Sequence, residues 1–123
     1  MKDLSKYTIQ ELLVQFRNAC LAQYDTYLTD NVGKYNKLFD FLIAVTRELK
    51  RRGVEERRAL LTLFADENPQ VRLQAAKNVY AVAPIEAKAC LEAIAAARLP
   101  DQSLSAGMTL NGLEEEPNCL DWI

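Results

Sequence analysis

Residues 66–76 read Asp66-Glu67-Asn68-Pro69-Gln70-Val71-Arg72-Leu73-Gln74-Ala75-Ala76. This stretch predicts a turn that leads directly into a helix. Asp66 can cap or brace the turn, and Pro69 suits the first turn of a helix because its missing N–H would be unpaired there anyway. Val71 is expected to point to the core, while the small Ala75 and Ala76 would let a second helix approach closely. We therefore expect a tightly packed helix that begins at Pro69.

Helical patterning continues on both sides of this stretch. Apolar residues recur three and four positions apart, which is the spacing of a helix that buries one face. Thr8 and Glu11 have the spacing of a capping box at the start of the first helix. No segment alternates apolar and polar residues with a period of two, so a sheet is not expected. The five predicted helices cover about 8–23, Asp30–Arg52, Glu55–Ala65, Pro69–Ala83 and Pro84–Leu99.

The last part of the chain, 101–123, has a different character. It contains no basic residue, includes the acidic run Glu114–Glu116, and has scattered Gly and Pro. Its apolar residues are nevertheless too numerous for a free solvated segment. A length of 123 residues suits a single domain. We therefore expect a helical domain over 1–100 and an extended tail over 101–123, packed on the domain or on a neighbouring chain.

The turn and helix of residues 66–76 resemble the central signature of HEAT repeats, in which a turn with Asp and Pro leads into Val-Arg-x-x-Ala-Ala. The whole chain is also similar to a family of short uncharacterised bacterial proteins with HEAT-like helices; Ala106-Gly107-Met108 matches one of its elements. The resemblance implies an all-α, HEAT/armadillo-like α–α superhelix of about five helices with an extended C-terminal tail. It further implies that Asp66 and Arg72 join a polar ladder, and it gives no residue a catalytic role.

The residue types present argue against an enzyme. The chain has no histidine, which removes Ser-His and Cys-His pairs and the commonest zinc ligand sets. No glycine-rich phosphate loop occurs. We therefore expect no catalytic residue, no cofactor and no metal. A polar N-terminus, an odd number of cysteines (three) and the lack of a long apolar run favour a cytoplasmic protein that does not enter membranes.

Three tyrosines, Tyr24, Tyr27 and Tyr35, surround the predicted loop between the first two helices. Large amphipathic rings are enriched where one protein grips another. The leading hypothesis is a protein–protein interaction module that holds an unknown protein or peptide, with a homodimer also open. The same tyrosines could instead be half-buried residues at the edge of the fold.

A basic cluster between Arg47 and Arg58 offers a different function. It holds six of the fifteen positive residues, with Arg51, Arg52, Arg57 and Arg58 as the candidate ligands, and Glu48, Glu55 and Glu56 lie among them. Helices with a basic face can bind nucleic acid through phosphate contacts. The alternative hypothesis is therefore a nucleic-acid-binding protein, set against a solvated helix end with local ion pairs.

Overall fold

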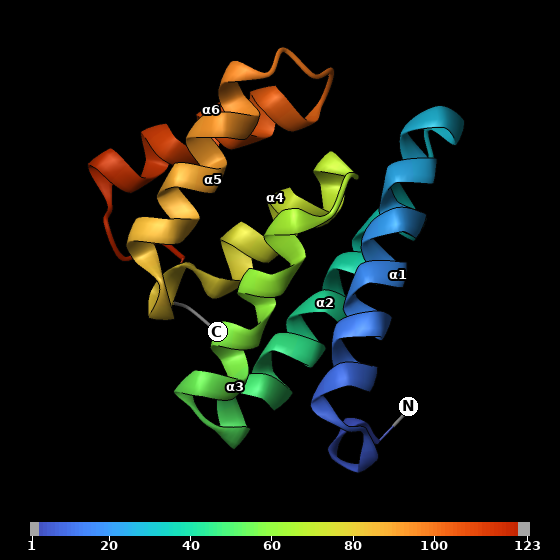
Figure 1. Cartoon of the computed structure of the whole chain (residues 1–123). Helices are drawn as coiled ribbons and strands as arrows, with labels where there is room; N and C mark the ends of the chain where they lie inside the picture. The colour runs from blue at the N-terminus through green and yellow to red at the C-terminus, as the bar shows by residue number, and fades with distance from the viewer. Residues whose placement is uncertain (1–2, 121–123) are drawn as a thin grey trace.

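The structure is a computed structural model that describes residues 3–120, and its regular elements are helical throughout, with no strand in that range (Figure 1). The predicted all-α class is therefore confirmed. No helix among these residues has the length and apolar character needed to cross a membrane. In chain order the elements are η1 (Leu4–Lys6), α1 (Ile9–Thr29), α2 (Val32–Arg52), α3 (Val54–Arg58), η2 (Ala59–Ala65), α4 (Pro69–Val79), η3 (Tyr80–Val82), α5 (Pro84–Ala96) and α6 (Gln102–Glu115), where η marks a 3-10 helix.

Helix ends follow local signals in the sequence. The predicted capping box is present: the Thr8 hydroxyl accepts from the Glu11 N–H at 3.1 Å, and the Glu11 carboxylate accepts from the Thr8 N–H at 3.0 Å. Pro69 is the first residue of α4, as predicted, with Asn68 as its N-cap. Gly53 separates α2 from α3 at a φ of 147°, where an added Cβ would lie 2.8 Å from the Glu56 carboxylate. Only glycine fits this corner without strain.

The helices form three successive layers. α1 pairs with α2, η2 packs on α4, and α5 pairs with α6. α4 lies in the middle, against α1 on one side and α5 on the other, as Figure 1 shows. Eight of its eleven residues are buried, including Val71, Ala75 and Ala76 of the predicted motif. This central helix is therefore packed against neighbouring helices on nearly every side.

Two predictions about local structure were wrong. Gln102–Glu115 forms helix α6, where an extended tail was expected; residues 121–123 of that tail lie outside the described residues. α6 packs along α5 and buries Ala106 and Leu113, so contacts with α5 offset the poor helix propensity of its two glycines. The predicted helix Glu55–Ala65 is split into α3 and the 3-10 segment η2.

Leu42 tests the assignment of the core. Its side chain is fully buried on α2, so Leu42→Ala should lower the free energy of unfolding by about 3 kcal/mol by leaving a cavity. Leu28→Ala is the matched control, because Leu28 is 83% exposed and its loss should change stability by less than about 0.5 kcal/mol. Urea denaturation of the two variants measures both values. Equal effects would mean that the core is misassigned.

Candidate binding site

A buried polar face runs along α4. Gln70, Gln74 and Asn78 follow one another at intervals of four residues, and each is at most 2% exposed. Residues four apart on a helix lie one above the other, so their amides form one column. A buried amide without partners is costly. The helices around α4 must therefore supply complementary polar groups.

Gln70 is the centre of these contacts. Its Nε2 donates to Gln23 Oε1 on α1 at 3.0 Å, and its Oε1 accepts from Gln102 Nε2 on α6 at 3.1 Å. Two phenols form longer hydrogen bonds with the same amide. The Tyr27 hydroxyl donates to Gln70 Oε1 at 3.5 Å, and Gln70 Nε2 donates to the Tyr35 hydroxyl at 3.4 Å. One amide thus joins α1, α2 and α6 to α4.

The column continues along α4 toward α3. Gln74 Nε2 donates to the Tyr35 hydroxyl at 3.4 Å, and Asn78 Nδ2 donates to the Gln74 carbonyl at 2.8 Å. Asn78 in turn accepts from the Thr46 hydroxyl at 2.9 Å and, through its carbonyl, from Arg57 Nε at 3.0 Å. The sequence analysis did not single out this column, although the spacing of Gln70, Gln74 and Asn78 is a readable signal of one helix face.

A pocket of about 430 Å³ opens beside this network, where α1 ends and α2 and α6 begin. The rings of Tyr27 and Tyr35 are 5.7 Å apart between centroids and tilted by 59°. Burial, and next the hydrogen bond with Tyr35, raise the pKa of the Tyr27 phenol above its ordinary value. We call this the tyrosine pocket, and the residues that line it are Thr26, Tyr27, Asp30, Asn31, Val32, Tyr35 and Asp101.

The tyrosine pocket carries negative charge. Asp30 and Asp101 are both exposed, and the described lining contains no basic side chain. The pocket therefore combines two aromatic rings with two carboxylates. Of the three candidate tyrosines, Tyr27 and Tyr35 are brought together here, whereas Tyr24 lies on the exposed surface of α1 and is absent from the described lining. Asp30 and Asp101 were not recognised from the sequence.

Asp66, at the start of the predicted motif, forms an ion pair with Arg17. Its carboxylate accepts from Arg17 on α1 at 2.5 Å and from the Asn68 N–H at 2.9 Å. Burial alone would raise the pKa of Asp66, but the hydrogen bonds from Asn68 and Arg17 hold it below its usual value. No hydrogen bond or ion pair joins Asp66 to Arg72 in residues 3–120, although the positive charge of Arg72 also lowers the pKa of Asp66. The hydrogen bonds of the Asp66 carboxylate therefore run to α1 and to its own turn.

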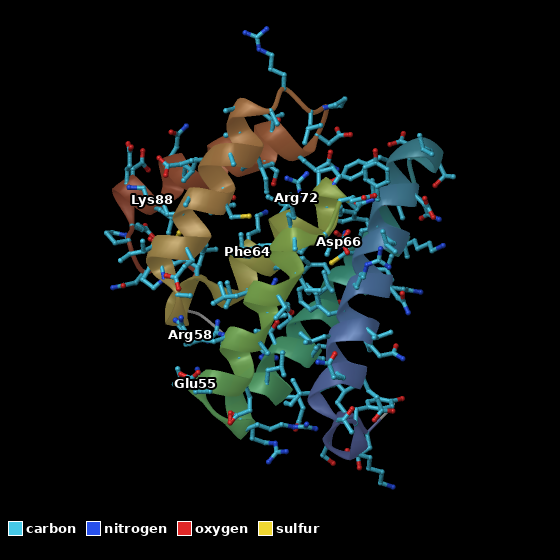
Figure 2. The ribbon with its side chains drawn as sticks, in the orientation of Figure 1. Glu55, Arg58, Phe64, Asp66, Arg72 and Lys88 are labelled. Carbon is cyan, nitrogen blue, oxygen red and sulfur yellow. The ribbon has the colours of Figure 1, made fainter. Side chains whose placement is uncertain are left out.

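Two of the four candidate arginines, Arg57 and Arg58, hold α3 against neighbouring elements. Arg57 is only 2% exposed and donates to the Asn78 carbonyl, so it cannot act as a surface ligand for phosphate and that prediction was wrong. Arg58, labelled in Figure 2, donates to the Val82 carbonyl at 2.7 Å and to the Glu86 carboxylate at 3.0 Å. Arg57 thus fixes α3 against α4, and Arg58 fixes it against the segment that leads into α5.

The other two arginines share one carboxylate. Arg51 and Arg52 both pair with Glu48, and hydrogen bonds from Arg51 and then Arg52 lower the pKa of Glu48 to about 2. Arg52 also donates to the carbonyls of Leu4 and Tyr7, which fastens the N-terminal turn to α2. Only Arg51 keeps a largely exposed side chain among the four. The cluster is therefore largely used within the fold.

Comparison with known proteins places this helical chain in a family. Residues 10–114 match the family described as a domain of unknown function, DUF2019, and the chain belongs to that family. It is also similar to the crystal structure of the protein RPA1889 from Rhodopseudomonas palustris CGA009, with 40% identity and a TM-score of 0.89, over 94% of this chain and 96% of that one. No curated protein matches. No group of residues that could hold a metal ion occurs in the described part of the chain.

Tyr35→Phe tests the link between the polar column and the pocket. The change strands the amide donors that Gln70 and Gln74 direct at the hydroxyl, so the free energy of unfolding should fall by about 1–2 kcal/mol. Tyr24→Phe removes the same atom from an exposed ring and should change stability by less than about 0.5 kcal/mol. Chemical denaturation compares the two variants. Indistinguishable stabilities would show that the Tyr35 hydroxyl contributes nothing.

Glu48→Gln tests the ion pairs of the basic cluster through pH. Because the pKa of Glu48 is lowered on folding, its contribution is fully present above its ordinary value of 4.5 and is lost as the pH falls toward about 2. The stability difference between wild type and Glu48→Gln should therefore shrink over this range. Denaturation at a series of pH values measures it. A difference that stays constant with pH would rule out the proposed role of the charge.

Proposed function

We propose that the protein is a protein-binding module in which the tyrosine pocket receives a lysine or arginine side chain of a partner polypeptide. The observation that supports this most is the joint presence of Tyr27, Tyr35, Asp30 and Asp101 in one open pocket. Aromatic faces attract cations, and carboxylates add charge and hydrogen-bond acceptors for an ammonium or guanidinium group. A pocket of this composition disfavours phosphate and other anions.

Preorganisation supports the same proposal. The hydroxyls of Tyr27 and Tyr35 are both bound to the buried amide of Gln70, so the rings are oriented before any partner arrives. A rigid aromatic anchor loses little conformational entropy on binding. Val32, which lines the pocket, is 64% exposed and provides apolar contact area at its rim. These features favour recognition over bond-making, and we propose no catalytic role.

The wider setting of the module is part of the proposal. Three successive helix layers, with the Asp66–Ala76 turn and helix at their centre, support a HEAT-like arrangement that offers a broad ridged surface. The three cysteines are free thiols: Cys20, Cys90 and Cys119. Free thiols support a cytoplasmic location, because thiols stay reduced in that compartment.

The proposal is tested by screening an array of short random peptides with the purified protein. Bound peptides should be enriched in Lys and Arg. Asp30→Asn/Asp101→Asn should weaken their binding by about fivefold or more, corresponding to about 1 kcal/mol. Asn tolerates the left-handed conformation of Asp30 (φ 54°), so the variant keeps the backbone.

The matched control removes two charges elsewhere. Asp40→Asn/Glu92→Gln makes the same change in net charge at exposed positions that are absent from the described lining of the pocket, and it should leave peptide binding unchanged. Absence of Lys and Arg enrichment, or equal loss in both double variants, would overturn the proposed function.

A further inference from the structure

A second concave surface continues from the tyrosine pocket along α6. It is a groove of about 500 Å³, and Tyr27 and Asp101 line both sites. We call it the α6 groove. Its described lining comes from α1, α4, α6 and the residues that follow α6, and consists of Tyr27, Lys77, Asp101, Leu104, Ser105, Met108, Thr109, Gly112, Cys119 and Leu120.

Lys77 gives the α6 groove a positive charge, and no acid among the described residues pairs with it. Its ammonium donates to the Ser105 hydroxyl at 3.1 Å, and no ion pair to it exists within residues 3–120. Burial lowers the pKa of the Lys77 ammonium. Asp101, the one carboxylate in the described lining, forms no ion pair with Lys77 and instead helps to raise the pKa of Tyr27. An incoming anion would relieve the cost of this half-buried cation.

Most of the remaining surface of the α6 groove is apolar. Leu104 and Met108 lie one turn apart on α6 and are 69% and 64% exposed. Exposed apolar side chains at this spacing are typical of surfaces that receive a polypeptide segment along a helix. The α6 groove shares Tyr27 and Asp101 with the tyrosine pocket, so one continuous segment can occupy both.

We propose that the α6 groove binds the same partner segment as the tyrosine pocket, and that this segment carries an acidic side chain, flanked by apolar residues, which pairs with Lys77. The inference rests on the proposed function, because it extends that site from Tyr27 and Asp101. The partner is thereby a polypeptide with a basic residue at one end, apolar residues between, and an Asp or Glu further along. Opposite charges at the two ends fix its direction on the protein.

The same peptide array tests this inference separately. Among the peptides that carry the basic residue, those that also carry Asp or Glu should bind about fivefold more tightly, corresponding to about 1 kcal/mol. Lys77→Met keeps the apolar stem and removes the charge, so it should abolish the acidic preference and leave the basic one intact. Lys88→Met is the control, since Lys88 is an exposed lysine on α5 (Figure 2), and it should alter neither preference.

The two failures are distinguishable. Loss of the Lys and Arg preference in wild type would overturn the proposed function, whereas a basic preference without an acidic one would overturn this inference alone. Titration of N-acetylglutamate methylamide into the wild-type protein, followed by amide NMR signals, gives a second readout that needs no variant. Shifts should centre on residues 104–109; shifts confined to other residues would contradict the role of Lys77.

Discussion

The buried amide of Gln70 needs a partner for each of its polar atoms, and α4 can occupy the middle of the core only when its neighbours provide them. Gln23 from α1 and Gln102 from α6 supply the shorter bonds, and the phenols of Tyr27 and Tyr35 add weaker ones. Apolar packing alone tolerates small shifts between helices, whereas paired amides require one register. The polar column on α4 therefore determines how the first and last helix pairs sit on the central helix.

This constraint also explains why the candidate site lies at one end of the molecule. The hydroxyls that satisfy Gln70 belong to the two rings of the tyrosine pocket. In the proposed function, stability and recognition therefore use the same side chains: the hydroxyl of each tyrosine bonds to the core, and its ring lines the pocket. The arginines of the basic cluster differ from the tyrosines. Arg52, Arg57 and Arg58 donate to backbone carbonyls, so these guanidinium groups are largely unavailable to a ligand.

Local signals in the sequence predicted the fold better than the site. The Asp66–Ala76 stretch, the Thr8 capping box and Pro84 each act within one or two helical turns, and each predicted a helix start correctly. Helix α6 was missed because Gly107 and Gly112 lower its intrinsic propensity and its stability comes from contacts with α5. The site depends on residues far apart in the chain, such as Tyr27 and Asp101, and a charge pattern does not reveal that Arg57 is buried.

A double-mutant cycle on Gln70 and Gln102 tests the central claim most directly. Each single change to Leu leaves the other amide buried without its 3.1 Å partner, while the double change removes both groups. The free energies of unfolding of the four proteins should be non-additive, with the double variant less destabilised than the sum of the single ones by about 1 kcal/mol or more. Additivity to within about 0.3 kcal/mol would show that the two amides do not hold α4 and α6 together.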